Sequence, residues 1–416
     1  MPKAFLHSLQ MMLTTFTRWN WFPDVFQVSI ALLACCLFQA SKWCTEPRNQ
    51  RFIMIFGIVH ETGLNEKRVC LTPQAARSLV EQGHQVYLET SAGDASGFTD
   101  QHYIKEGVQV VFNREELFGR ADTLLKIRPL SLEDIGMLRD GQTVMAFHHL
   151  SVTTREIFKS LLDKKINTIG MEIMEADNGH RPVLTIMSEL AGQMAPIISG
   201  NYLGRDPMGK GLALGSVPGV APASVVIVGG GTVGISAARA FLGLGAQVHI
   251  LDNNIEQLRH VRSEFGDRVT TLFANESNLS KMLQFADVLV AAVLVHGQLT
   301  PQLFSREMIA TMKPRSIFID YSVDEGGTSE TTRPTIHSDP VYIDEGVIHY
   351  CVPNVTSGVN RTASIALSNV LSDYLSVLAE LGPDEAIKQN SVLSRGLYTS
   401  QGKSRQPLLD KRYGVK

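Results

Sequence analysis

The chain has few cysteines, little net charge and no apolar run of membrane-spanning length, and each shortage excludes a class of protein. Five cysteines in 416 residues form no C-x-x-C pair and no spacing with histidine that suits zinc. This usage is typical of a reduced cytoplasmic protein without a metal site. A formal net charge of −3 gives no reason to expect nucleic acid as a partner.

Residues 1–53 differ from the rest of the chain. They hold Trp19 and Trp21 close together and an apolar stretch of 16 residues, Val25 to Ala40. A membrane-spanning helix needs about 20 apolar residues, and neither the basic start nor the cleavage site of a signal peptide is clear. We therefore predict an N-terminal extension, with the functional protein beginning near Met54 and no attachment to a membrane. A membrane anchor is the alternative.

From Met54 onward, short apolar runs alternate with helical patterns. The strands expected in the first half of the chain are Ile55 to Val59, Gln85 to Thr90, Thr123 to Ile127 and Val144 to Phe147. Such alternation predicts a mostly parallel α/β sheet. Two long helices are expected, Met187 to Leu203 and Ile365 to Leu381, and we place the second against the first sheet. The polar tail after Pro383 is predicted to cover an interface.

One stretch, Val225 to Asp252, carries the clearest functional signal. It has the pattern of a strand, a glycine turn, a helix and a second strand, with Gly229, Gly231 and Gly234 at G-x-G-x-x-G spacing. These glycines allow a tight turn, close approach of a pyrophosphate and close helix packing, and an acid ending the second strand accepts hydrogen bonds from a ribose. An ordinary glycine-rich turn is the alternative, but the flanking elements favour a dinucleotide. Because the Asp252 carboxylate repels a 2′-phosphate, NAD is favoured over NADP.

Several polar side chains follow predicted strands, where ligands bind in such sheets. Lys126, His149 and Asp324 come at strand ends, and Arg68 follows a strand and a turn. Three of them have a structural alternative: a surface ion pair for Arg68, a core position for His149 and a turn for Asp324. Lys126 is unusual, because lysine is rarely buried unpaired, whereas His148 is predicted to face away. Two cations, an imidazole and a carboxylate beside a nicotinamide suit hydride transfer on a small anionic substrate.

The chain resembles the alanine dehydrogenase family, which includes the transhydrogenase alpha subunit. The resemblance runs from Met54 nearly to the end, in the words NEKRVCLTP, LLKI, FHHL, MSELAG, VPGV, IVGGGTVG, MKP, VDEGG, HYCVPN and RTASIALSN. It implies a two-domain α/β fold, with a Rossmann-type NAD-binding domain (187–360) inserted into a discontinuous substrate domain (54–186 and 361–416). It also implies NAD as cofactor, a homohexamer, and reversible oxidative deamination of L-alanine to pyruvate and ammonia.

The resemblance assigns roles by position. Arg68 and Lys126 would hold the carboxylate and carbonyl of the substrate. His149 would be the general acid and base, and Asp324 would assist at the reacting amine or water. With the fingerprint glycines included, the cofactor-binding residues are Ser188, Gly229, Gly231, Thr232, Val233, Gly234, Asp252, Val293, Leu294, Asp324, Arg333 and Asn354.

The chain also departs from the family pattern. The family's P-x-E is Val59-His60-Glu61 here, its Lys-Glu-Pro is Arg128-Pro129-Leu130, and its I-D-Q-G-G is Val323 to Gly327 with glutamate in place of glutamine. A family lysine that contacts the ribose is Gln257. We expect these changes to affect the reaction rate and the choice of substrate more than the type of reaction.

The alternative functions are those of a transhydrogenase subunit, a non-catalytic NAD-binding protein and a dehydrogenase for another amino acid. A transhydrogenase subunit would lack the role of His149, and no membrane segment follows downstream. A non-catalytic NAD-binding protein is disfavoured because Arg68, Lys126, His149 and Asp324 are all present. A related dehydrogenase acting on another amino acid stays open.

Overall fold

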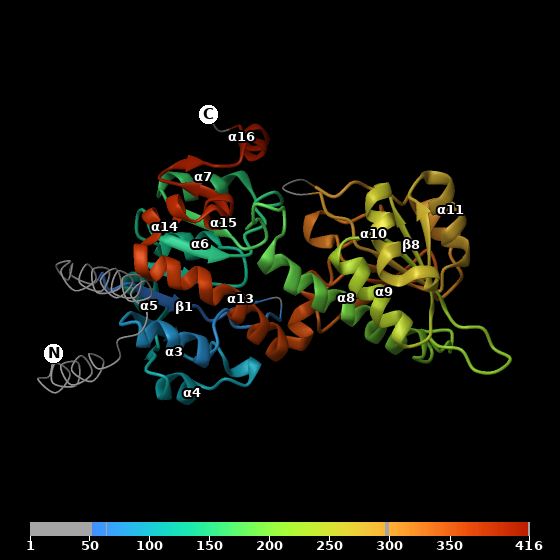
Figure 1. Ribbon diagram of the computed structural model, residues 1–416, viewed down its shortest axis with the longest axis horizontal. Coiled ribbons are helices and arrows are strands. Elements are labelled where there is room, and N and C mark those ends of the chain that lie inside the picture. Colours follow the sequence, from blue (N-terminus) through green and yellow to red (C-terminus); the bar gives the residue numbers. More distant parts are fainter. Residues whose placement is uncertain (1–51, 64, 296–298, 415–416) are drawn as a thin grey trace, which may run out of the picture. The chain divides into compact units, whose positions relative to one another are not determined.

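The computed structural model describes residues 52–63, 65–295 and 299–414 (Figure 1). The predictions made for the N-terminal extension, including the apolar stretch Val25 to Ala40, lie outside these residues. Among the helices that are described, none has the length and apolar character needed to cross a membrane. In the same part of the chain, no three His, Cys, Asp or Glu side chains gather as a metal site would require.

The first sheet has eight strands in the order β15-β14-β6-β5-β4-β1-β2-β3. Strands β1 to β6 are parallel to one another, and β14 pairs with β6 in antiparallel orientation. The bounds are β1 (Ile55–Ile58), β2 (Gln85–Glu89), β3 (Gln109–Val111), β4 (Thr123–Leu125), β5 (Thr143–Ala146), β6 (Asn167–Gly170), β14 (Leu397–Ser400) and β15 (Lys403–Ser404). The tail after Pro383, expected only to cover an interface, therefore supplies a buried strand to this sheet, because its residues 397–400 are all buried.

Helices cover both faces of this sheet. They are α3 (Pro73–Glu81), α4 (Asp100–Lys105), α5 (Arg114–Arg120), α6 (Leu132–Met137), α7 (Arg155–Asp163), α13 (Asn360–Leu381), α14 (Pro383–Gln389), α15 (Ser391–Arg395) and α16 (Pro407–Tyr413). On one face, α13 packs Leu367, Leu371 and Leu375 against Phe56 and Ile58 of β1. Figure 1 shows α13 beside α3 and β1, so the helix lies against the first sheet as its apolar pattern predicts.

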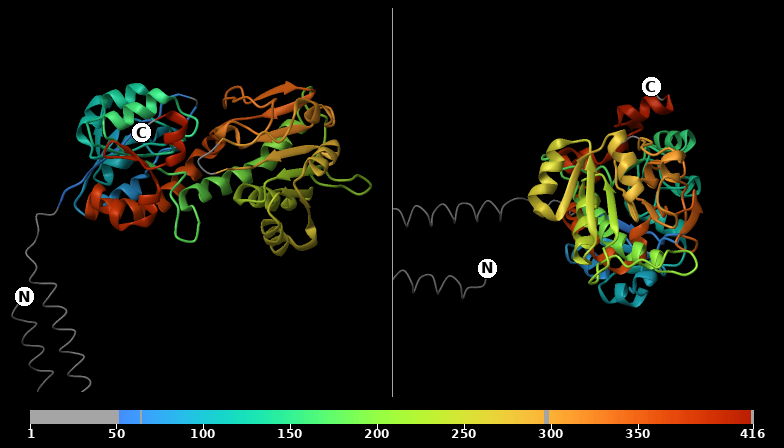
Figure 2. Two further views of the ribbon diagram at one scale, coloured as in Figure 1. Left: turned by 90° about the horizontal axis from the view of Figure 1, so that it is seen from above. Right: turned by 90° about the vertical axis from the view of Figure 1, so that its right-hand side faces the viewer.

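The second sheet has seven strands in the order β12-β13-β11-β10-β7-β8-β9, visible in Figure 2 from green through yellow to orange. All are parallel except the edge strand β12. The strands are β7 (Ser224–Val228), β8 (Gln247–Asp252), β9 (Val269–Phe273), β10 (Val288–Ala291), β11 (Ile317–Asp320), β12 (Val341–Asp344) and β13 (Val347–Tyr350). The helices are α8 (Pro182–Leu203), α9 (Thr232–Gly243), α10 (Ile255–Phe265), α11 (Glu276–Phe285) and α12 (Arg306–Ala310).

Both sheets are doubly wound. In the first, the strand order reverses between β1 and β4, and in the second it reverses between β7 and β10. Side chains at the carboxyl ends of strands beside such a reversal are where α/β proteins bind ligands. Each sheet therefore offers one possible ligand site, at the carboxyl ends of the strands beside its reversal.

The long helix α8 contributes to the cores of both sheets. Near its start, Val183 and Met187 lie in the core shared with α13, whereas Ala191 and Ala195 lie in the core of the second sheet. The helix begins five residues before the predicted start, with Pro182 in its first turn, where proline costs no hydrogen bond. Further along, a side chain at Gly192 would come within 2.5 Å of the carbonyl oxygen of Val233, so the glycine lets α8 pack closely on α9.

Candidate active site

The carboxyl ends of both sheets border one cavity of about 360 Å³. The first sheet contributes the segments that follow β1, β4, β5 and β6, and the second contributes those that follow β10, β11 and β13 together with the start of α9. The residues predicted for the site that line this cavity are Arg68, His149, Ser188, Val233, Val293, Leu294, Asp324 and Asn354.

The turn between β7 and α9 depends on two of its three fingerprint glycines. Gly229 has a φ of +106°, and a side chain there would lie 2.3 Å from the carbonyl oxygen of Ala292. A side chain at Gly234 would lie 2.0 Å from the carbonyl oxygen of Gly229. At Gly231, in contrast, a side chain would meet nothing within 4 Å. The two outer glycines are needed for packing, and the exposed middle one leaves the backbone open to a ligand.

Asp252 ends β8 beside this turn and also holds it in place. One carboxylate oxygen accepts a hydrogen bond of 2.8 Å from the N–H of Gly230, and the other accepts one of 2.8 Å from the N–H of Asn254. Gln257, which stands where the family has a ribose-binding lysine, donates to the carbonyl oxygen of Gly230 at 2.5 Å. The carboxylate therefore orders the turn, and its oxygens retain capacity to accept further hydrogen bonds.

Two other predicted cofactor contacts lie outside the cavity lining. Thr232 is exposed at the first position of α9. Arg333 is also exposed, and its guanidinium stacks 4.1 Å from the ring centroid of Tyr342. The cofactor roles of both residues stay predictions.

His149 follows β5 and is fixed by two carboxylates. Its backbone has a φ of +44°, and its N–H donates a 2.6 Å hydrogen bond to Glu172. Its ring nitrogen Nδ1 lies 2.9 Å from an oxygen of Glu325. Burial disfavours the imidazolium, but the hydrogen bond that the ring donates to Glu325 and the charges of Glu172, Asp324 and Glu325 outweigh it and raise the pKa of His149 to about 9.

The neighbouring histidine has no access to the cavity. His148 is 1% exposed and its Nε2 lies 3.3 Å from the carbonyl oxygen of Val144. Burial lowers the pKa of His148 to about 4, so this side chain is neutral. Of the adjacent pair, only His149 is placed to exchange protons with a bound substrate.

Asp324 and Glu325 lie on a short 3-10 turn, η3 (Val323–Glu325), after β11. Burial raises the pKa of Asp324 to about 7, although the charge of His149 opposes the shift. Glu325 accepts a second hydrogen bond, of 2.5 Å, from the hydroxyl of Ser151. The second sheet thus brings two carboxyl groups to the imidazole of the first.

Arg68 is buried and paired rather than exposed. Its guanidinium makes two hydrogen bonds of 2.7 Å to the carboxylate of Glu66 and one of 2.8 Å to the hydroxyl of Thr356. Asn354 donates to the same carboxylate at 3.2 Å. Arg68 reaches the cavity, but its charge is balanced by Glu66.

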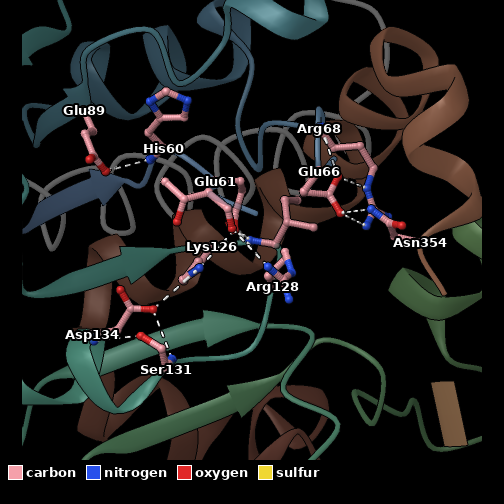
Figure 3. A network of polar contacts seen from close by, with 12 residues as sticks. His60, Glu61, Glu66, Arg68, Glu89, Lys126, Arg128, Ser131, Asp134 and Asn354 are labelled. Carbon is pink, nitrogen blue, oxygen red and sulfur yellow. Dashed lines mark hydrogen bonds and ion pairs between the residues drawn. The ribbon is translucent and has the colours of Figure 1, made fainter. Parts of the chain in front are cut away.

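Lys126 lies in a buried ion network (Figure 3). It is not among the residues that line the cavity. The residue is 3% exposed, and its Nζ lies 3.0 Å from Glu61 and 3.8 Å from Asp134. Asp134 in turn pairs with Arg114, which also contacts Glu89. The unusual lysine of the apolar strand thus has buried carboxylate partners, of which Glu61 also accepts hydrogen bonds from the backbone after β4.

The second cation on the cavity wall is Arg128, two residues further along. Its side chain is half-buried and donates to the carbonyl oxygen of Thr62 at 3.0 Å. Across the residues the structure describes, no carboxylate lies within ion-pair distance of this guanidinium. Arg128 therefore offers the cavity a positive charge that no carboxylate of the described residues balances.

Four residues that shape the site were not among the predicted ones: Arg128, Glu172, Glu325 and Tyr398. Arg128 and Glu325 both occupy positions where the sequence departs from the family pattern, and those departures were the available signal. No sequence signal marked Glu172 or Tyr398. The hydrogen bond of 2.8 Å from the Tyr398 hydroxyl to Glu172 joins positions that are 226 residues apart.

Two family models together match most of the chain. Residues 57–191 match the model of the alanine dehydrogenase/PNT N-terminal domain, and residues 195–407 match that of the C-terminal domain. The alanine dehydrogenase of Methanococcus maripaludis is 40% identical over 351 residues, covering 84% of this chain and 94% of the relative.

Two solved structures have the same architecture. An L-alanine dehydrogenase is 36% identical, with a TM-score of 0.80 over 87% of this chain and 99% of that one. A transhydrogenase from Sinorhizobium meliloti is 25% identical, with a TM-score of 0.70 over 85% of this chain and 99% of that one.

The fold defines a two-domain α/β protein, in which a Rossmann-type domain is inserted into a domain built from both ends of the described chain. More particularly, the chain belongs to the alanine dehydrogenase/PNT family.

Proposed function

We propose that this chain is an alanine dehydrogenase that catalyses the reversible, NAD-dependent oxidative deamination of L-alanine to pyruvate and ammonia. The observation that carries the proposal is the meeting of an unbalanced cation, an imidazole and a carboxyl group in one cavity beside a dinucleotide turn. Arg128, His149 and Asp324 supply these groups, and all three line the cavity.

NAD fits the residues around the turn between β7 and α9. The open backbone at Gly231 and the N-terminus of α9 would hold the pyrophosphate, and Asp252 would hold the adenosine ribose. Val293 and Leu294 line the cavity on the side where a nicotinamide would lie next to the substrate. When bound, NAD⁺ supplies the acceptor for the hydride on the α-carbon of the substrate.

The substrate carboxylate is assigned to Arg128, with Arg68 beside it. Arg128 has no carboxylate partner among the described residues, whereas Arg68 already balances Glu66. A guanidinium binds a carboxylate in a fixed, planar geometry, which orients the α-carbon. Lys126, first expected in this role, has its charge taken up by Glu61, so we assign it to the stability of the loop that carries Arg128.

His149 is assigned as the general acid and base. In deamination its neutral ring removes a proton from the water that adds to the oxidised α-carbon, and in the reverse direction its protonated ring returns that proton. Asp324 lies in the same cavity, and burial with a pKa near 7 lets it exist in either form at neutral pH. It would contact the amine or the water during these steps.

The deciding experiment measures NADH formation from NAD⁺ with a panel of L-amino acids, alongside the reverse reaction with pyruvate and ammonium. We expect L-alanine to give the highest kcat/KM, and Arg128→Met to raise the KM for alanine without preventing NADH binding. Higher activity with another amino acid would make the chain a dehydrogenase of that substrate. Hydride exchange between two nicotinamide nucleotides, without amino-acid turnover, would instead favour the transhydrogenase function.

We further propose that the active enzyme is a homohexamer in the cytoplasm, as the resemblance implies. Light scattering of the purified chain measures its mass directly. A monomer with full activity would contradict the assembly and leave the proposed reaction intact.

A further inference from the structure

The carboxylate of Glu325 joins the two halves of the site. It lies on η3 in the second sheet's half, is 8% exposed, and faces the loop after β5 in the first sheet's half. One of its oxygens lies 2.9 Å from Nδ1 of His149, and the other accepts the 2.5 Å hydrogen bond from the Ser151 hydroxyl. Ser151 therefore fixes the rotation of the carboxylate, and the carboxylate fixes the ring.

The backbone of His149 is constrained independently. Glu172 accepts the N–H groups of His148 and His149 at 3.2 and 2.6 Å, and these bonds hold His149 at its positive φ. With the main chain held by Glu172 and Nδ1 held by Glu325, Nε2 is the ring nitrogen left to face the cavity. The hydrogen bond on one imidazole nitrogen determines which nitrogen is available for chemistry.

We propose that Glu325 is a positioning residue for the reaction, forming with His149 a carboxylate–imidazole pair that holds Nε2 toward the substrate and stabilises the protonated ring. The inference rests on the proposed role of His149 as general acid and base. It concerns a position where the family pattern has glutamine, which can accept the same hydrogen bond but carries no charge.

Charge explains why glutamate and glutamine differ here. The ionisable groups that face His149 are Glu172 after β6, Asp324 and Glu325 on η3, and His148 beside it. Of these, only Glu325 makes a hydrogen bond to the ring. A carboxylate in direct contact favours imidazolium over imidazole, in agreement with the raised pKa of His149.

The consequence concerns the direction of the reaction. Below the raised pKa, His149 is protonated, which is the form that donates a proton when pyruvate is aminated. Glu325 therefore favours amination near neutral pH and moves efficient deamination to alkaline pH. With glutamine at this position, the neutral form would appear at lower pH.

The experiment compares the unmodified protein with the Glu325→Gln variant by NMR titration of ¹³C-labelled histidines. The His149→Gln variant identifies the resonance of His149. We expect His149 in the parent to titrate well above an ordinary histidine, and Glu325→Gln to lower its pKa by about one to three units. The acidic limb of kcat/KM for deamination should move by the same amount. Glu325→Asp, which keeps the charge, should keep more of the raised pKa, and Glu330→Gln, at an exposed glutamate nearby, should leave it unchanged.

The NMR titration does not depend on turnover. If the parent fails to oxidise alanine but Glu325→Gln lowers the pKa of His149, only the proposed reaction is wrong. An ordinary pKa for His149 in the parent would overturn the inference even if the variant does not fold. A pKa that stays raised in Glu325→Gln would also overturn it.

Discussion

Replacing Lys126 and Arg128 separately by methionine distinguishes a residue that stabilises the site from one that binds substrate. Lys126→Met leaves Glu61 buried without the Nζ that lies 3.0 Å away, and also removes the contact at 3.8 Å to Asp134. Removing one partner of a buried ion pair costs about 3–5 kcal/mol. We therefore expect a large loss in the free energy of unfolding, partly restored when Glu61→Gln is added, because the double variant removes the unpaired charge.

Arg128→Met should instead leave the stability almost unchanged and weaken the binding of substrate. Its side chain is half-buried and loses one hydrogen bond, to the carbonyl oxygen of Thr62, so stability should change by about 1 kcal/mol or less. A charged hydrogen bond to a substrate carboxylate contributes about 1.5–3 kcal/mol, which predicts a loss of roughly 10- to 100-fold in kcat/KM for alanine. Urea unfolding followed by circular dichroism and NADH absorbance measure the two effects. If Lys126→Met kept full stability but lost alanine binding, and Arg128→Met changed neither, Lys126 would be the substrate-binding cation.

Three further predictions concern the imidazole and the cofactor. The deprotonated form of His149 is the base, and its pKa is about 9. We therefore expect kcat/KM for deamination to fall about tenfold for each pH unit below 9. A pH–rate profile in which kcat/KM begins to fall only near the ordinary histidine pKa of about 6.5 would contradict this. His149→Ala should lower the rate by roughly 10²-fold or more while NADH fluorescence titration shows retained binding, whereas buried His148→Ala should lower the unfolding midpoint more than the rate. Asp252→Asn, which can still accept from Gly230, should narrow the preference for NAD over NADP, and an unchanged ratio of kcat/KM values would mean that charge does not set it.

Features set by local pattern could be predicted from the sequence. The turn through Gly229 and Gly234 and the placement of Asp252 at a strand end depend on neighbouring residues, and the structure has them as expected. Strand ends were predicted one or two residues too long, as at Thr123 to Ile127, which in the structure ends at Leu125.

Contacts between distant segments could not be predicted. A lysine in an apolar strand is unusual, which marks Lys126 in the sequence. Its partner Glu61 lies 65 positions away, so the sequence does not distinguish a buried ion pair from a substrate contact. Likewise, the bond between His149 and Glu325 spans 176 positions and depends on how the two sheets meet. The local sequence of each residue contains no information about the other.

The antiparallel strand β14 places the end of the chain inside the first sheet, and this affects how the enzyme is made. Synthesis proceeds from the N-terminus, and domains fold as their residues emerge. The second sheet is complete once Tyr350 has emerged, but Glu172 lacks the hydroxyl of Tyr398 until nearly the whole chain has been translated. The loop that carries His149 therefore gains its full set of contacts later in synthesis than the glycine turn does.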